Sequence, residues 1–282
     1  AGWALFFWPA HPVVAAMGAM AILLGYAWVL ALELVLLAVF AGADHAPRPG
    51  WGALLRAWWG EVLAFPRVFF WRQAFRADAV SDFLPARAPG TAAVRGVVFV
   101  HGLFCNRGFW TPWMRQLLAR GRPFMAVNLS PPWGDIDAQA QGIEVAVQRI
   151  TDATGLAPVL VCHSMGGLVV RSWLRGALAG DRIHRVVTIA TPHAGTWMAR
   201  LSGSVHGIQM RRGSAWLAKL HGDAAAAPDY SRFVCWYSNT DNMVFPAPTA
   251  TLPGADNRCV PGVAHVALAF EPRVMRETLA LV

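Results

Sequence analysis

Charged side chains are scarce in this chain of 282 residues. Asp, Glu, Lys and Arg together make up 14% of it, whereas 56% of the residues are hydrophobic, and the mean hydropathy is +0.40. An ordinary soluble enzyme carries about a quarter charged residues. This composition therefore does not fit a protein surrounded only by water, and we expect part of the chain to lie in lipid.

Cysteine is scarce as well, and its spacing excludes two classes of small, stapled protein. The chain has four cysteines, with neither the density of a disulfide scaffold nor the C-x-x-C spacing of a metal site. Cys162 and Cys235 fall in apolar runs and should be buried thiols. Cys105 and Cys259 fall in loops that we expect at the same end of the fold, so a disulfide between them stays open. Histidines and carboxylates show no ligand spacing either, so the sequence predicts no metal and no cofactor.

Lysine is almost absent, since Lys219 stands alone and arginine carries nearly all of the positive charge behind the net charge of +8. Such a charge could indicate nucleic acid as the partner, but no nucleic-acid motif is visible. Arginine beside a hydrophobic segment is more simply explained by attraction to anionic lipid headgroups. We therefore predict a membrane partner and no nucleic acid; the oligomeric state is left open.

The longest apolar run extends from Val13 to Ala41, where the only ionisable side chains are Tyr26 and Glu33. As a helix this run would be about 43 Å long at 1.5 Å per residue, more than the ~30 Å hydrocarbon core requires. It predicts a tilted transmembrane helix, and we assign residues 1–42 to an anchor. A carboxylate is expensive in lipid, so Glu33 should have a partner.

Two other interpretations of this run are open. It could be a buried core helix, or a signal peptide in which Ala41-Gly42-Ala43 resembles a cleavage site. Against a signal peptide stand the missing basic region and an apolar run about twice the usual length. The apolar stretch Ala1 to Trp8 could be the end of an earlier spanning helix, with Pro9 to Pro12 as the turn.

Residues 43–93 have a different character, because arginines alternate with tryptophans and phenylalanines from Arg48 to Arg76. Such a segment suits the headgroup region of a membrane, although the aromatics could equally pack on the rest of the protein. Arginines on this side of the apolar run favour a cytoplasmic location for residues 94–282, by the positive-inside rule. Pro85 to Thr91 is expected to be a linker.

From Val94 to the end, apolar runs of strand length alternate with helical patterns, which is typical of a mostly parallel sheet with helices on both faces. We predict an α/β fold with about six strands in a domain at residues 94–282. The expected strands are Gly96 to Val100, Phe124 to Leu129, Pro158 to Val161, Val186 to Ala190, Phe233 to Tyr237 and Arg258 to Val260, and the expected helices are Thr111 to Ala119, Asp137 to Thr151 and Leu168 to Ala179.

One strand leads directly into a helix through Cys162-His163-Ser164-Met165-Gly166. A serine on such a turn needs small residues two positions before and after it, because the backbone is pinched there. Gly166 meets this requirement and Cys162 nearly does. The turn would lift the Ser164 hydroxyl out of the sheet, and the N–H of Met165 at the helix start could face an oxyanion.

Three further stretches occur in the order that a Ser-Asp-His hydrolase requires: Phe99 to Leu103 upstream, Asn239 to Val244 downstream and Gly262 to His265 last. With these motifs the sequence resembles bacterial lipases and esterases of the α/β-hydrolase superfamily, from roughly Val94 to Val282. The resemblance implies an α/β-hydrolase fold, Ser164 as nucleophile, Asp241 as acid, His265 as base, and an oxyanion hole formed by the backbone N–H groups of Leu103 and Met165.

Other residues compete for these roles. His101 and His163 adjoin the motifs but belong to the turns, and Asp256 and Asp223 are rivals of Asp241. An insertion at about residues 197–231 carries an apolar face beside arginines and is similar to a lipase lid, although a plain surface helix would show the same pattern. We assign five residues to the substrate pocket or lid: Phe104, His193, Met210, Trp216 and Val244.

Together these observations predict a membrane-anchored serine ester hydrolase, a lipase or esterase that cleaves acyl esters through an acyl-enzyme on Ser164. Lipids or lysolipids are the expected substrates because of the anchor. Two alternatives are an acyltransferase with the same three residues and a non-catalytic membrane scaffold with a hydrolase fold. Acyl-chain length and headgroup are not indicated by the sequence.

Overall fold

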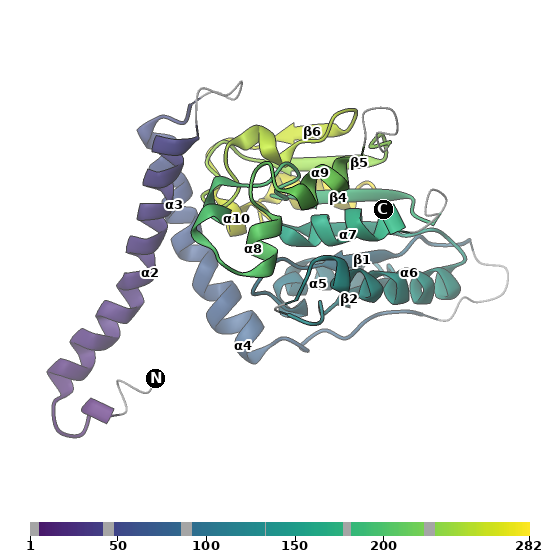
Figure 1. Ribbon diagram of the computed structural model, residues 1–282. Helices are drawn as coiled ribbons and strands as arrows, with labels where there is room; N and C mark the ends of the chain where they lie inside the picture. The colour runs from purple at the N-terminus through teal and green to yellow at the C-terminus, as the bar shows by residue number, and fades with distance from the viewer. Residues whose placement is uncertain (1–5, 42–47, 86–91, 133, 177–181, 223–228) are drawn as a thin grey trace.

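A computed structural model of the chain describes residues 6–41, 48–85, 92–132, 134–176, 182–222 and 229–282. Its centre is a six-stranded sheet in the order β2-β1-β3-β4-β5-β6, and every pair of neighbours is parallel. The strands are β1 (Val97–Val100), β2 (Phe124–Val127), β3 (Val159–His163), β4 (Arg185–Ile189), β5 (Phe233–Tyr237) and β6 (Asp256–Cys259). The predicted parallel sheet of six strands is confirmed (Figure 1).

Helices cover both faces of the sheet. Successive residues of a strand point to opposite faces, and because both sets are apolar, each face forms a hydrophobic core. Val98 and Val100 of β1 pack with α6 (Ala140–Thr154) and α7 (Met165–Gly176) on one face. Val97 and Phe99 pack on the other face with α5 (Thr111–Ala119) and α11 (Pro272–Leu279). The short helix α10 (His265–Leu268) lies just before α11.

Most boundaries differ from the prediction by one to three residues, and two of the differences have a clear physical reason. Helix α7 begins at Met165, three residues before the predicted start, because the two glycines of the turn are already helical; the predicted end at Ala179 lies outside the described residues. Strand β6 begins at Asp256, two residues before the predicted start. This edge strand is polar and largely exposed, so an apolar pattern gives no signal for it.

The insertion after β4 consists of η4 (Trp197–Leu201), α8 (Val205–Gln209) and α9 (Ala215–His221). Residues 223–228 of the predicted lid, including Asp223, lie outside the described residues. Each of the two helices begins with a serine that caps it: Ser204 accepts from Gly207 N, and Ser214 accepts from Leu217 N. Polar contacts hold the insertion to the sheet domain, since Gln209 donates to Asp135 at 2.8 Å and Trp216 Nε1 donates to Asp137 at 3.0 Å.

The N-terminal part is helical. Helix α2 (Pro12–Phe40) is long and apolar enough to cross a membrane, by length and composition. A second helical stretch runs through α3 (Trp51–Phe65), the π-helical η1 (Pro66–Arg72) and α4 (Gln73–Phe75), and α3 packs between α2 and α10. Figure 1 shows that the upper half of α2 lies near α3, and Tyr26 at its middle donates to Val62 O of α3 at 2.8 Å, while the lower end of α2 projects away.

The segment after α4 leads back to the sheet. Phe83 pairs with Phe124 through two backbone hydrogen bonds of 3.0 and 2.9 Å, so it extends the sheet beside its edge strand β2. Arg107 joins this segment to the domain through Asp82 at 2.8 Å. Of the predicted linker, only Pro85 lies within the described residues.

Candidate active site

Ser164 occupies the turn between β3 and α7, at the carboxyl end of a central strand. Its φ angle is +53°, a left-handed conformation that is uncommon for a residue with a side chain. The turn is held from both sides, because Ser164 N donates to Ile189 O at 2.9 Å and Thr191 Oγ1 donates to Ser164 O at 2.8 Å. Ser164 is also partly exposed, whereas β3 before it is buried. The fold therefore presents this hydroxyl at the sheet edge.

Two glycines let neighbouring backbone approach this turn. A Cβ on Gly166 would lie 2.5 Å from His101 O, so only glycine allows the start of α7 to pack against the end of β1. A Cβ on Gly102 would lie 2.8 Å from Ser164 Cβ. The peptide that leads into Leu103 therefore passes directly beside the serine. Met165 is the first residue of α7, so its N–H has no acceptor one turn earlier.

His265 and Asp241 complete a chain of hydrogen bonds to this serine. His265 Nε2 lies 3.1 Å from Ser164 Oγ, and His265 Nδ1 lies 2.9 and 3.0 Å from the two carboxylate oxygens of Asp241. Because a carboxylate only accepts, Nδ1 carries a proton and Nε2 of the neutral ring accepts from the hydroxyl. The structure thus brings together the three residues that the sequence singled out, from three separate loops.

The loop after β5 fixes Asp241. Its Oδ1 also accepts from Met243 N at 2.9 Å and Val244 N at 2.8 Å, and its side chain is almost completely buried. Burial opposes a charge on His265, but the carboxylates of Asp241, Glu61 and Glu33 outweigh this and raise the pKa of His265 above its ordinary value. These carboxylates therefore stabilise the imidazolium that forms when His265 takes up a proton.

Three residues that the sequence offered as alternatives for the acid and the base make other contacts. Asp256 on the exposed edge strand pairs with Arg258 at 2.6 Å, which holds the pKa of its carboxyl below the usual range. Burial lowers the pKa of His101 to about 4, and its Nε2 accepts from Leu129 N at 3.1 Å. His163 is buried, stacks on Phe109, and its Nε2 donates to the His265 carbonyl at 3.2 Å.

The five predicted pocket residues divide into two groups. Phe104 is 64% exposed beside the serine turn, and Met210 and Trp216 belong to the insertion. The His193 ring is fully buried, and its Nε2 faces Thr188 Oγ1 at 3.0 Å. Val244 is likewise buried, and the atom it presents to the site is its backbone nitrogen. Both side chains are therefore buried in the interior of the protein.

Three carboxylate and amide side chains around His265 were not predicted as parts of the site. Asn242 Oδ1 accepts from His265 N at 3.0 Å, and its Nδ2 donates to Glu33 in α2 at 2.6 Å. Glu61 in α3 accepts from Val266 N and Ala267 N, both at 2.9 Å. One signal was present in the sequence: Glu61 is the only carboxylate between Asp44 and Asp78, in a stretch otherwise charged by arginine.

Neither metal nor disulfide chemistry finds support among the described residues. They contain no group of three or more His, Cys, Asp or Glu side chains that could hold a metal ion. All four cysteines are free, which answers the open question about Cys105 and Cys259.

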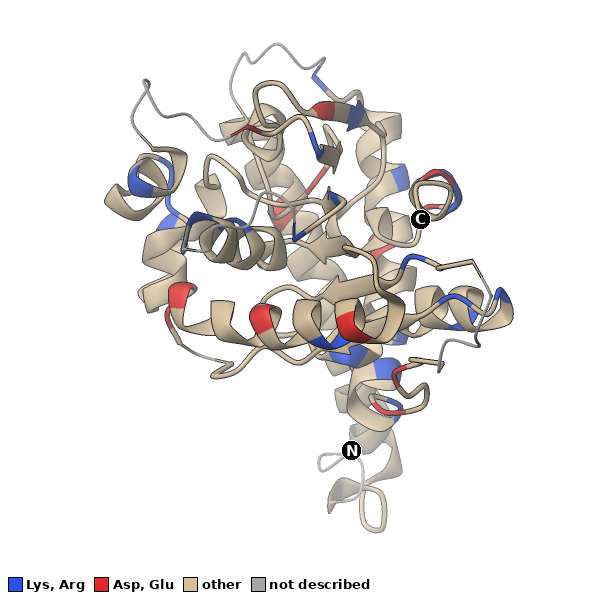
Figure 2. Ribbon diagram, turned by 90° about the vertical axis from the view of Figure 1, so that its right-hand side faces the viewer, with Lys and Arg blue, Asp and Glu red and all other residues tan. Residues whose placement is uncertain are grey.

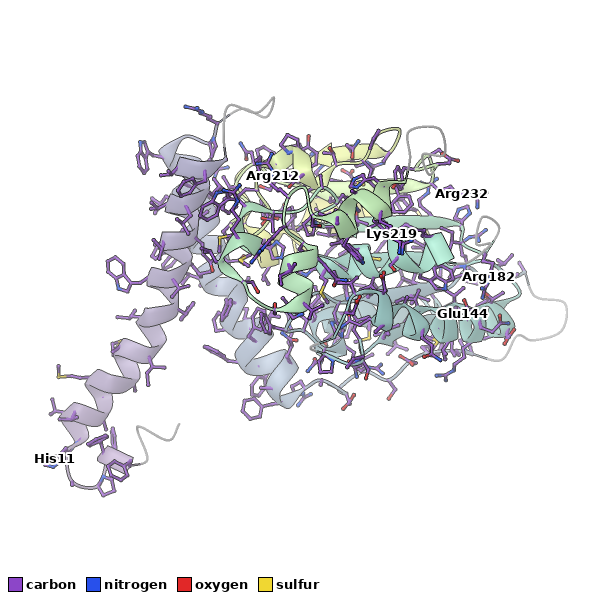
Figure 3. The ribbon with its side chains drawn as sticks, in the orientation of Figure 1. His11, Glu144, Arg182, Arg212, Lys219 and Arg232 are labelled. Atoms are coloured by element: carbon purple, nitrogen blue, oxygen red, sulfur yellow. The ribbon has the colours of Figure 1, made fainter. Side chains whose placement is uncertain are left out.

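The ion pair Glu144–Arg182, at 2.6 Å, lies at the end of the molecule away from α2 (Figure 3) and so takes no part in this site.

Comparisons with known proteins identify the fold and the family. The chain superimposes on a lipase of Bacillus licheniformis, in its mature form, with a TM-score of 0.60 and 18% identity, covering 70% of this chain and 95% of that one. Lipase B of Aspergillus fumigatus gives a TM-score of 0.54 at 18% identity, covering 66% of this chain and 49% of that one. At this identity the likeness concerns the fold. The model of the alpha/beta hydrolase family matches residues 97–278, so the chain belongs to the alpha/beta hydrolase family.

Proposed function

We propose that this protein is a serine carboxylic ester hydrolase that cleaves acyl esters through an acyl-enzyme on Ser164. The observation that carries the proposal is the continuous chain from Ser164 Oγ through the His265 ring to the Asp241 carboxylate, with distances of 3.1 and 2.9 Å. A serine hydroxyl is a weak nucleophile near neutral pH, and this arrangement supplies both the base and the group that orients it.

Each residue has a defined role in the proposed reaction. As Ser164 Oγ attacks the ester carbonyl, His265 Nε2 takes its proton, and Asp241 stabilises the resulting imidazolium. The backbone N–H groups of Leu103 and Met165 would stabilise the oxyanion. His265 then gives the proton to the departing alcohol, and a water molecule repeats the sequence to release the carboxylic acid.

A membrane anchor is the second part of the proposal. From Pro12 to Leu32, helix α2 carries no charged side chain and presents exposed apolar residues. This stretch is about 31 Å long, close to the ~30 Å hydrocarbon core. Figure 2 shows that charged residues lie on the remainder of the protein, and His11 marks the far tip of the helix in Figure 3. We therefore divide the chain into an anchor (1–42), a juxtamembrane segment (43–93) and a catalytic domain (94–282), with the domain on the cytoplasmic face.

Ester substrates that reside in the membrane, such as lipids or lysolipids, fit this placement. Several exposed apolar side chains belong to the loop after β1 and to the insertion: Phe104, Leu201, Val205 and Ile208. The end of the second helical stretch adds Phe70, Trp71 and Phe75, which are also exposed. Aromatic side chains of this kind suit the boundary between water and lipid. A substrate could then enter from the membrane surface, because the anchor and the catalytic residues are close together.

The decisive test combines covalent labelling with turnover. A fluorophosphonate probe should label the wild-type protein at Ser164, and Ser164→Ala should lose both the label and at least about 10³-fold of kcat on a p-nitrophenyl acyl ester. Ser231→Ala, which alters an exposed serine bonded to Asp229, serves as the matched control and should behave as wild type. A folded Ser164→Ala protein with near-normal turnover would refute the proposal.

A further inference from the structure

The helix that carries His265 lacks a cap of its own. Helix α10 starts after Ala264, whose methyl side chain cannot accept a hydrogen bond, so the first N–H groups of the helix need acceptors from elsewhere. Asn242 Oδ1 accepts a hydrogen bond from His265 N at 3.0 Å. The two carboxylate oxygens of Glu61 accept from Val266 N and Ala267 N at 2.9 Å each. The first turn of α10 is thus held entirely by side chains from other elements.

Glu61 reaches this turn from α3, which precedes it by about two hundred residues in the sequence. The carboxylate is only 2% exposed. The two helices approach closely because small residues face each other: a Cβ on Gly60 would lie 3.9 Å from Ala267 Cβ. This close approach lets the Glu61 carboxylate reach the N–H groups of Val266 and Ala267, which have no acceptor within α10.

A second contact links the other N-terminal helix to the same turn. Asn242, which holds His265 N, donates its Nδ2 to Glu33 of α2 at 2.6 Å. The N-terminal helices thus supply two carboxylates behind the catalytic histidine, one directly and one through an amide. A segment that served only as an anchor would not need to supply either of them.

We propose that Glu61 is a positioning residue for the catalytic base: its carboxylate fixes the first turn of α10 and thereby holds the His265 imidazole in line with Ser164. The N-terminal helices are then part of the active site as well as the anchor. This inference rests on the proposed ester hydrolase function. A displacement of about 1 Å in a catalytic group can lower a rate on the order of 10²-fold, so a support of this kind affects kcat rather than substrate binding.

Because the Glu61 carboxylate can carry a charge near His265, the proposal predicts how the pH dependence of the rate changes when Glu61 is replaced. Four titratable groups face His265: Asp241 after β5, Glu33 on α2, Glu61 on α3 and His163 on β3. Burial raises the pKa of Glu61 to about 7, and its negative charge contributes to the raised pKa of His265. Removing that charge should let His265 lose its proton at lower pH. A cap with a purely structural role would change the rate by the same factor at every pH.

The test uses the full chain in membranes, with Glu61→Gln as the principal variant. Gln is similar in shape but offers one acceptor oxygen, so one N–H of α10 loses its partner. We expect kcat per fluorophosphonate-titrated site to fall at least about tenfold with KM within about twofold. The ratio of variant to wild-type kcat/KM should rise as the pH is lowered from 8 to 6, on the order of several-fold. Glu277→Gln, which removes a half-buried carboxylate paired with Arg273 and Arg258, is the matched control and should match wild type.

Glu61→Asp is the second variant, because it keeps the charge but shortens the reach. Its kcat should fall less than that of Glu61→Gln, and its dependence of kcat/KM on pH should match that of the wild type. Wild-type kcat per site in Glu61→Gln would overturn the inference; if that variant yields no titratable protein, wild-type kcat in Glu61→Asp would overturn it instead. Wild-type protein that is not labelled at Ser164 would mean that the proposed function itself has failed, whereas a labelled wild type with unaffected Glu61 variants would refute this inference alone.

Discussion

The Glu33 carboxylate of α2 accepts a 2.6 Å hydrogen bond from Nδ2 of Asn242, the residue next to Asp241 in the chain. A carboxylate in an otherwise apolar helix needs such a partner, since an unpaired charge in lipid is expensive. Pairing it with a residue of the catalytic loop places the start of the proposed spanning segment beside the candidate active site. On the other side of Glu33, residues 12–32 of the helix, about 31 Å in length, carry no charged side chain.

The first prediction concerns the carboxylate that serves His265. Asp241→Asn should keep the shape of the loop but stabilise the wrong tautomer of the imidazole, lowering kcat by up to about 10⁴-fold, by analogy with serine proteases. Asp256→Asn is the matched control and should cost little, because Asp256 pairs with Arg258 on the exposed edge strand. Both are measured in one ester hydrolysis assay. A large loss in Asp256→Asn together with a small one in Asp241→Asn would reverse the assignment.

The second prediction concerns the approach of Leu103 to the serine. Gly102→Ala would place a methyl group 2.8 Å from Ser164 Cβ. Because the contact is with the rigid turn, the loop must shift and the N–H of Leu103 must move with it. Removing one oxyanion donor costs about 10² to 10³ in kcat, and we expect a loss of this order.

Gly203→Ala provides the control for this glycine. Gly203 lies in the insertion, and a Cβ there would meet nothing within 4 Å. It should therefore leave kcat close to wild type. If the two variants hydrolyse the ester equally fast, Leu103 does not supply an oxyanion donor.

The sequence predicted the sheet from its apolar runs, and it predicted the three residues of the hydrogen-bonded chain from motifs that follow or precede these runs. Apolar runs mark buried strands, and the fold brings the loops after β3 and β5 and the turn before α10 to one edge. The polar edge strand β6 gave no such signal at its start. Glu61 could not be assigned from sequence, because its partners are backbone N–H groups, which every residue except proline carries. The burial of the His193 ring could not be predicted from the sequence either, because histidine is a polar residue that is more often partly exposed.

The third prediction concerns the membrane. The full chain should stay with the membrane fraction after washes with high salt and with alkaline carbonate, because α2 buries an apolar surface that neither treatment weakens. Introducing two charges in the projecting part, Ile22→Asp with Val29→Asp, should weaken this retention, at about 2.5 to 3.5 kcal/mol for an Asp at the helix centre. Immunoblots of the pellet and supernatant measure the distribution.

The matched control places the same two charges on the catalytic domain. Leu118 and Val145 are exposed apolar residues of α5 and α6, comparable in exposure to Ile22 and Val29. Leu118→Asp with Val145→Asp should leave retention unchanged. Release of the wild-type chain by salt alone would show that α2 does not span the membrane.

The last prediction concerns pH. His265 must be neutral to accept the serine proton, and the surrounding carboxylates raise its pKa above the ordinary value of 6.5. As the pH falls through this raised pKa, the imidazole is protonated and kcat/KM should fall about tenfold for each further pH unit. Asp241→Asn removes the strongest of these charges, so its residual activity should persist to lower pH than that of the wild type. The measurement is kcat/KM against pH from 5 to 9 for both proteins, with Asp256→Asn as a third curve that should match the wild type. An acid limb at the same pH in the wild type and in Asp241→Asn would mean that His265 is not the group that titrates.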